Sequence, residues 1–158
     1  MIDARRFCRE SRRLEGVLGL RAFPRLDDLL AHREGEVAFV LEGIPGENGE
    51  ARLRLEVRGV LSLVCQRCLE AVEETLVIER LLELVEEIDS SITPEELEDE
   101  RLDFLPLTGA LDLAELIEEE ILLALPVAPR HAACAAPRPA GVVSGAHPFS
   151  VLSSLKAR

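Results

Sequence analysis

Apolar and polar residues alternate along two neighbouring stretches in the first half of the chain, residues 36–44 and 53–57. The apolar positions are Val37, Phe39 and Leu41 in the first stretch and Leu53, Leu55 and Val57 in the second. An alternation with a period of two residues predicts a strand that buries one face. Between the two stretches lies Pro45-Gly46-Glu47-Asn48-Gly49, a run of residues typical of turns. The pattern therefore predicts a β-hairpin.

The second stretch continues into an apolar segment that ends at a Cys-x-x-Cys motif. Gly59 interrupts the alternation, as glycine does at a bulge or bend, and residues 60–64 lead directly to Cys65. Residues 69–87 alternate only in part, and their leucines and glutamates are also compatible with a helix. We favour strands here, because a Cys-x-x-Cys knuckle in a small site is commonly a turn between two strands.

Helical patterns occur at three places. Residues 24–33 carry leucines at helical spacing with carboxylates near their start, which predicts a short helix. Residues 93–96, Thr-Pro-Glu-Glu, are typical of a helix start and predict one or two turns. The clearest helix spans residues 112–125, because Asp112 can cap its start and Pro126 ends it. Its carboxylates are expected to lie largely in solvent: Glu115, Glu118, Glu119 and Glu120.

These elements predict an α+β fold in a single domain. We expect an antiparallel β-sheet or a partial barrel with a few flanking helices over residues 1–130. Residues 131–147, rich in Ala and Pro, are expected to form a linker. Residues 148–158 predict a short C-terminal amphipathic helix that begins with proline.

The composition is that of a folded protein with an aliphatic core. Hydrophobic residues make up 47% and charged residues 30% of the chain, whereas aromatic residues make up only 3%. No window approaches the roughly 18 to 20 apolar residues of a membrane span, and no apolar run follows the arginines of residues 1–13. We therefore expect no membrane association and no signal peptide. The cysteine pattern favours the reducing cytoplasm over a secreted disulfide framework.

Charge is distributed unevenly along the chain, whose net charge is -12. Residues 65–120 hold nineteen Asp and Glu against three Arg, whereas residues 1–33 hold eight Arg against five acids. Residues 126–158 contain no acid and four basic residues. An acidic surface repels phosphate and attracts basic proteins, so any direct RNA contact is expected at the two ends. Acidic residues also keep small proteins soluble without any partner.

Two pairs of metal-ligating residues stand out, Cys65 with Cys68 and His131 with Cys134. Two thiolates two residues apart can chelate one ion, and the second pair can complete a tetrahedral structural zinc site if the fold brings the pairs together. Two alternatives stay open. Cys65 and Cys68 can form a redox dithiol, which would require the motif at a helix N-terminus, or they can be unligated thiols in a surface turn.

Motifs of catalysis are missing from the sequence. No serine lies in a Gly-x-Ser-x-Gly elbow, and no glycine-rich loop of the phosphate-binding kind is present. Runs of glutamate are explained more simply as a solvated helix face. We therefore expect a protein that is not an enzyme and has no small-molecule substrate.

Three segments resemble a known family. They are Cys65-Gln66-Arg67-Cys68-Leu69, the stretch from Leu111 to Pro126 that ends in Leu-Ala-Leu-Pro, and Pro148-Phe149-Ser150-Val151-Leu152-Ser153-Ser154-Leu155-Lys156. In this order and spacing they resemble the YceD family of bacterial large ribosomal RNA subunit accumulation proteins. The resemblance implies a mixed α and β fold and a role in ribosome assembly. The chain departs from the family between Cys134 and His147, where an Ala/Pro-rich stretch replaces acidic or cysteine-bearing ones.

The expected function is a non-catalytic ribosome-biogenesis factor that binds large-subunit ribosomal RNA, ribosomal proteins or assembly factors. The candidate binding residues are Glu115, Glu118, Glu119, Glu120, Phe149, Leu152, Leu155 and Lys156. In this hypothesis the acidic middle holds a basic protein, and the terminal helix docks on RNA or on a second partner. A rival hypothesis is direct RNA binding through the arginines of residues 5–13 and the basic tail. A third is a zinc- or thiol-dependent protein that acts through Cys65 and Cys68.

Overall fold

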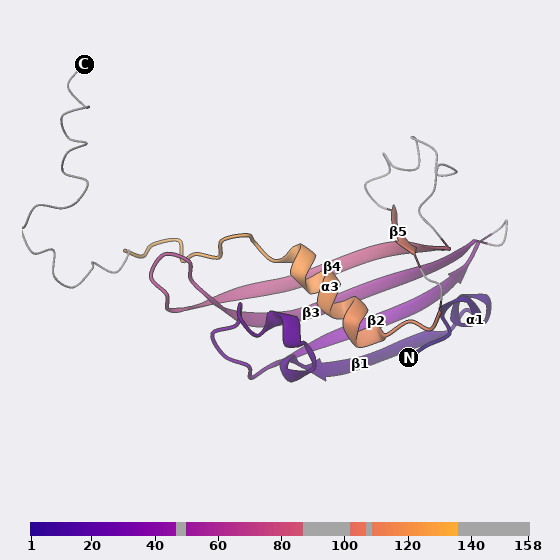
Figure 1. Ribbon diagram of the computed structural model, residues 1–158, viewed down its shortest axis with the longest axis horizontal. Coiled ribbons are helices and arrows are strands. Elements are labelled where there is room, and N and C mark those ends of the chain that lie inside the picture. Colours follow the sequence, from indigo (N-terminus) through magenta and orange to yellow (C-terminus); the bar gives the residue numbers. More distant parts are fainter. Residues whose placement is uncertain (47–49, 87–101, 107–108, 136–158) are drawn as a thin grey trace, which may run out of the picture.

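The computed structural model describes residues 1–46, 50–86, 102–106 and 109–135. Its elements are helix α1 (Ala4–Arg9), strand β1 (Arg13–Gly19), two 3-10 turns (Leu20–Ala22 and Pro24–Leu26), strands β2 (Glu36–Pro45), β3 (Ala51–Val64), β4 (Ala71–Val85) and β5 (Leu102–Pro106), and helix α3 (Leu113–Ala124). Figure 1 shows a long sheet with α3 lying across it and α1 at one end.

The five strands form one open sheet in the order β1-β2-β3-β4-β5. Strands β1 to β4 pair antiparallel, and β5 joins β4 in parallel. The predicted hairpin is confirmed, since Phe39 pairs with Val57 and Leu41 with Leu55. The strand predicted after the Cys-x-x-Cys motif is confirmed as β4. The α+β class is thus confirmed, with an open sheet rather than a partial barrel.

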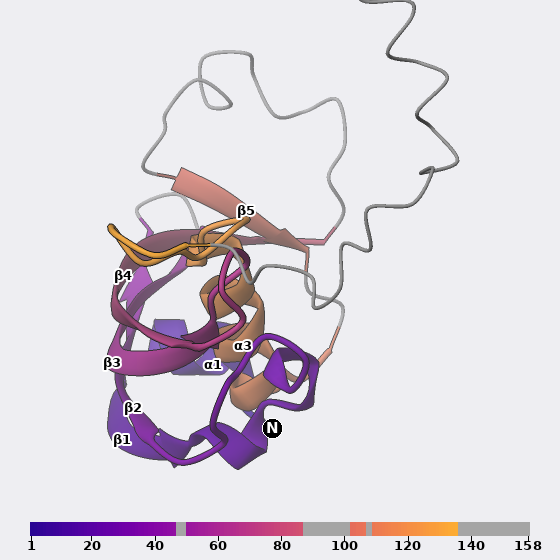
Figure 2. The same cartoon turned by 90° about the vertical axis from the view of Figure 1, so that its left-hand side faces the viewer.

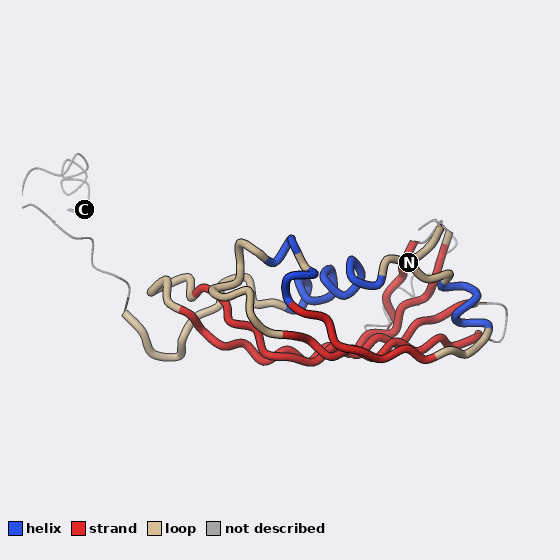
Figure 3. The backbone as a smooth tube through the Cα atoms, turned by 90° about the horizontal axis from the view of Figure 1, so that it is seen from below, coloured by secondary structure: helices blue, strands red, loops and turns tan. Residues whose placement is uncertain are grey.

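The core lies between the sheet and the helices. Figure 2 looks along the sheet and shows it curving around α3, and Figure 3 shows the helices on one side of the strands. The buried side chains of β2 and β3 alternate along each strand, as a sheet with one covered face requires. The largest fully buried side chains are almost all aliphatic: Leu20, Leu26, Leu41, Leu53, Leu55, Leu61, Leu63, Ile117 and Ile121, with Phe23 as the aromatic exception.

Helix α3 begins and ends where the sequence predicts. The Asp112 carboxylate accepts hydrogen bonds from the N–H groups of Ala114 and Glu115, at 2.9 and 3.3 Å, and so caps the first turn. Leu125 has an extended backbone, as a residue before proline prefers. Leu116, Ile117 and Ile121 are buried against the sheet. The prediction of this helix is confirmed.

The expectation that the four glutamates of α3 lie in solvent is wrong for two of them. Glu118 and Glu120 are only 4% and 6% exposed, whereas Glu115 and Glu119 are exposed. The Glu118 carboxylate accepts a hydrogen bond of 2.6 Å from the Arg25 N–H. Glu120 pairs with Arg80 at 3.1 Å, and its burial raises the pKa of its carboxyl despite that partner. Helical periodicity did not identify these two residues, because their partners come from distant segments.

Replacing Glu118 by alanine tests this burial. Glu118→Ala removes the acceptor of the Arg25 N–H and leaves that group without its partner, so we expect a loss of about 1–3 kcal/mol in the free energy of unfolding. Glu119→Ala, on the exposed face of the same helix, is the matched control and should change it by less than about 0.5 kcal/mol. Urea denaturation of both variants measures the difference, and equal losses would contradict the assigned hydrogen bond.

Other expectations need correction or lie outside the described residues. In place of a helix over residues 24–33, the chain forms only the 3-10 turn Pro24–Leu26, and Leu30 then pairs with Leu63 in a β-bridge. Pro24 begins this turn, and a short connecting segment favours a 3-10 turn over a longer helix. Leu26 and Leu30 are both buried in this conformation. The predicted turns at residues 93–96, the terminal helix at 148–158 and most of the linker at 131–147 lie outside the described residues. The domain boundaries stay a prediction.

Helix α1 and strand β1 were not predicted. Helix α1 packs on β2 at Gly43, where an added Cβ would approach the Phe7 carbonyl oxygen to 2.6 Å and the Cys8 Cα to 2.7 Å. Only glycine therefore permits this close approach of the two backbones. Within the described part of the chain, none of the helices has the length and apolar character needed to cross a membrane.

Candidate metal centre

Two segments that are distant in the sequence meet at the end of the sheet opposite α1 (Figure 1). One is the turn between β3 and β4, residues 65–70, and the other is the segment that follows α3. The turn is closed by the Cys65 N–H, which donates to the Glu70 carbonyl, and by the Leu69 N–H, which donates to the Cys65 carbonyl, both at 2.9 Å. The Gln66 N–H donates to the Pro129 carbonyl at 2.9 Å and joins the segments.

This junction brings together Cys65, Cys68, His131 and Cys134. The Sγ atoms of Cys65 and Cys134 are 3.7 Å apart, and Cys68 Sγ lies 3.4 Å from His131 Nδ1. One donor atom from each residue lies within 4.8 Å of the others. Tetrahedral zinc, with bonds of about 2.3 Å to sulfur and about 2.0 Å to imidazole nitrogen, would place neighbouring donors roughly 3.5–3.8 Å apart. The four residues therefore lie close enough to bind a metal ion, and the fold brings the two pairs together, as the zinc hypothesis requires.

The imidazole of His131 has the orientation of a metal ligand. Its Nδ1 faces the Cys68 thiol, and its Nε2 lies 2.9 Å from the Ala71 carbonyl oxygen. A carbonyl is only an acceptor, so the Nε2 atom carries the proton and donates it to Ala71. Nδ1 is then the nitrogen with a free lone pair in the neutral ring. A hydrogen bond from the second ring nitrogen to a carbonyl is the usual support of a ligating histidine.

The sulfur atoms are surrounded by hydrogen-bond donors. The Arg67 Nε donates to Cys134 Sγ at 2.9 Å, and its Nη2 donates to the His131 carbonyl at 3.4 Å. The Cys65 sulfur accepts hydrogen bonds from the backbone N–H groups of Cys68, Arg67 and His131. These bonds, of which that from Cys68 has the largest effect, lower the pKa of the Cys65 thiol to about 5, although burial opposes this. Thiolate is the form of cysteine that binds metals. The site therefore stabilises the ligand form of its most buried cysteine.

When no metal is bound, the closeness of His131 to the sulfur atoms and to the Ala71 carbonyl favours the protonated form of its imidazole. The hydrogen bonds with Cys134, Cys65 and the Ala71 carbonyl raise the pKa of the His131 imidazole. A bound cation takes the place of this proton, since ligation requires the neutral imidazole and the thiolates. Metal binding at this site is therefore expected to release protons.

The thioredoxin-like alternative lacks its structural requirement. Cys68 is followed by Leu69 in a left-handed conformation (φ 64°) and then by strand β4, not by a helix whose N-terminus would face the thiols. Cys65 is also fully buried, which closes it to a large substrate. All four cysteines, including the distant Cys8, are free thiols. The geometry thus favours a metal ligand set over a dithiol that exchanges with partners.

Comparison with protein families gives a match over about two thirds of the chain. The family model described as large ribosomal RNA subunit accumulation protein YceD matches residues 53–156, which include nearly all of β3, the whole of β4 and α3, and all four residues of the candidate centre. This chain belongs to the YceD family. The resemblance seen in the sequence is confirmed. Neither the curated proteins nor the solved structures contain a match to the chain.

The YceD description names accumulation of an RNA and no chemical reaction. Among the other predicted site residues, Glu115 and Glu119 are exposed on α3, Glu118 and Glu120 are buried, and Phe149, Leu152, Leu155 and Lys156 lie outside the described residues. Sequence reasoning missed Arg67 as the donor to Cys134. Its place inside the Cys-x-x-Cys motif was the available signal, because that position must lie next to the sulfur atoms.

Proposed function

We propose that this YceD protein is a non-catalytic factor of ribosome assembly in the cytoplasm, which supports the accumulation of large-subunit ribosomal RNA by binding RNA or basic ribosomal proteins. The observation that carries the proposal is the family match over residues 53–156. The junction of the β3–β4 turn with the segment that follows α3 also supports it. This junction, which we call the clamp, resembles a structural link between two segments more than a catalytic centre.

The clamp is proposed to hold one structural zinc ion through Cys65, Cys68, His131 and Cys134. Three soft thiolates and one imidazole are a donor set that suits zinc, and four protein ligands leave no open position for a substrate. The positive charge of Arg67 next to Cys134 offsets part of the negative charge of such a centre. Zinc would thus tie the segment after α3 to the β3–β4 turn.

This tie would determine where the chain beyond residue 135 leaves the domain. The terminal segment carries the proposed contacts Phe149, Leu152, Leu155 and Lys156, with apolar residues at helical spacing and a terminal charge. On α3, the burial of Glu118 and Glu120 leaves Glu115 and Glu119 as the carboxylates open to a basic partner. We therefore restrict the acidic part of the proposed surface to these two.

The test combines cells and extract. Deleting the gene should lower the ratio of large-subunit to small-subunit ribosomal RNA, and the wild-type gene should restore it. The tagged protein should retain ribosomal RNA or ribosomal proteins at low salt and release them at high salt, since exposed charges are screened. An unchanged RNA ratio in the deletion strain would overturn the proposed function.

The acidic surface has its own variant in the same experiment. Replacing Glu115 and Glu119 by glutamine should reduce the retained basic proteins at low salt. The matched control replaces Glu34 and Glu73, which are exposed elsewhere and change the net charge equally. A reduction of the same size in both variants would show that only the overall charge matters and would contradict a surface on α3.

A further inference from the structure

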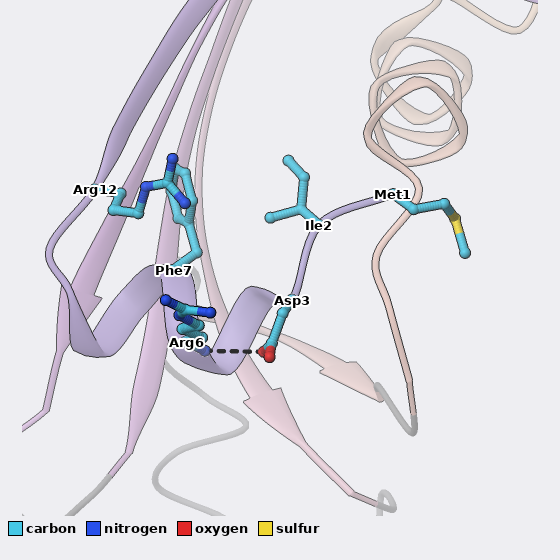
Figure 4. A pocket seen from close by; sticks show the side chains of 6 residues that line it. All are labelled: Met1, Ile2, Asp3, Arg6, Phe7 and Arg12. Atoms are coloured by element: carbon cyan, nitrogen blue, oxygen red, sulfur yellow. Dashed lines mark hydrogen bonds between the residues drawn. The ribbon is translucent and has the colours of Figure 1, made fainter.

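A pocket lies beside α1, at the end of the sheet far from the metal centre. Its volume is about 400 Å³, and it is lined by Met1, Ile2, Asp3, Arg6, Phe7 and Arg12. Figure 4 shows the Arg6 and Arg12 side chains on one side of it and the chain from Met1 to Asp3 on the other. Sites for small organic ligands commonly have volumes of about 300–1,000 Å³, so one nucleotide can be accommodated.

The pocket faces a concentration of positive charge. Arg5, Arg6, Arg9, Arg12 and Arg13 fall within nine residues of sequence, and all five are exposed. Arg5, Arg6 and Arg13 form exposed ion pairs with Glu86, Glu10 and Glu42. Such pairs contribute little energy in water, so a phosphate can replace the carboxylate. Among the described residues, Arg9 and Arg12 have no carboxylate within ion-pair distance.

The Glu10 carboxylate is stabilised by the positive charge of three arginines, Arg6, Arg9 and Arg12. The hydrogen bond from Arg6, followed by the charges of Arg6, Arg12 and Arg9, lowers the pKa of the Glu10 carboxyl. The charges of three arginines therefore act on a carboxylate that, of the three, only Arg6 contacts. The excess positive charge is local, although the whole chain carries a net charge of -12.

Arg12 is held in place before any ligand arrives. Its N–H donates to the Phe7 carbonyl at 3.0 Å, and its carbonyl accepts from the Gly43 N–H at 2.8 Å. Its guanidinium lies 5.7 Å from the centroid of the Phe7 ring, which is itself buried. The guanidinium therefore lies over an aromatic ring, and Arg12 is exposed to solvent. Unpaired RNA bases stack on such arginine planes.

We propose that this pocket binds single-stranded RNA, with phosphates held by Arg6 and Arg12, which line it, and a base stacked on the guanidinium of Arg12. The inference rests on the proposed function for the choice of RNA over an acidic peptide. One further feature favours RNA. Arginines that bind phosphate in a fork geometry also offer a plane for stacking, and a peptide of glutamates would use only the charge.

The test measures binding of the full-length protein to a labelled, unstructured 12-nucleotide RNA at several salt concentrations. The Arg6→Gln/Arg12→Gln variant, which removes the two arginines that line the pocket, should bind about tenfold more weakly at low salt. The slope of log K against log salt should become shallower by roughly 0.7 for each phosphate that the variant no longer neutralises. The matched control is Arg54→Gln/Arg58→Gln, which removes the same charge from exposed positions on the sheet and should bind as the wild type does.

Three results would overturn the proposal: no binding of this RNA by the wild-type protein, equal weakening in both double variants, or equal displacement of the RNA by poly-glutamate of the same charge. The last result would assign the pocket to acidic peptides. The failure of this inference is distinguishable from failure of the proposed function, because purified protein is used here and the RNA ratio in the deletion strain is measured independently.

Discussion

Cys65→Ser should abolish metal binding and lower the thermal stability of the protein more than any other single change at the metal centre. The wild-type protein, purified under reducing conditions, should contain about one zinc ion per chain, and the variant less than about a tenth of this. Cys65 is the fully buried member of the proposed ligand set, and its sulfur accepts hydrogen bonds from the backbone N–H groups of Cys68, Arg67 and His131. A serine hydroxyl is a poor zinc ligand, so three ligands remain. We expect the melting temperature to fall by about 10 °C.

The matched control is Cys8→Ser. Cys8 is equally buried, but its Sγ donates to the Arg52 carbonyl at 3.1 Å and lies in another part of the core. The hydroxyl can make the same hydrogen bond, so the zinc content should stay at one ion per chain. A chelator should lower the melting temperature of the wild type and of Cys8→Ser and leave that of Cys65→Ser unchanged. Full zinc content in Cys65→Ser would show that these residues are not the ligands.

Ile117→Ala should cost about 2–5 kcal/mol in the free energy of unfolding, as large-to-small substitutions in a close-packed core do. Ile117 has no exposed surface, and it is one of the three apolar residues that α3 buries, with Leu116 and Ile121. The cavity left by the substitution cannot be filled by a neighbour from a rigid, paired sheet. Chemical denaturation measures the loss.

Leu123→Ala is the control on the same helix. Its side chain is 70% exposed, so its removal should change the free energy of unfolding by less than about 0.5 kcal/mol. Both variants should keep the full zinc content, because neither residue is a ligand. A small effect of Ile117→Ala would contradict the position of α3 over the sheet.

The sequence alone determined the elements whose signals are local. The alternation in residues 36–44 and 53–57 indicated the hairpin, because the side-chain period of a strand matches one buried face. The cap at Asp112 and the stop at Pro126 delimited α3 within one residue. The three family segments also lie in the sequence itself, and the four proposed metal ligands are visible there as two separate pairs.

The tertiary structure alone decided which distant groups meet. Periodicity could not show that Glu118 and Glu120 are buried, since their partners, Arg25 and Arg80, lie 93 and 40 residues away. The packing of α1 on Gly43 was equally hidden, because it depends on two backbones approaching each other.

The metal centre shows the division most clearly. Two thiolates spaced for chelation are a property of the sequence, but the second pair reaches them only because α3 crosses the sheet and directs the chain back to the β3–β4 turn. The pocket beside α1 has the same origin: its arginines are plain in the sequence, and the stacking of Arg12 on Phe7 exists only in the fold. A coordination sphere or a binding pocket is a relation between atoms in space, and packing of the core sets that relation.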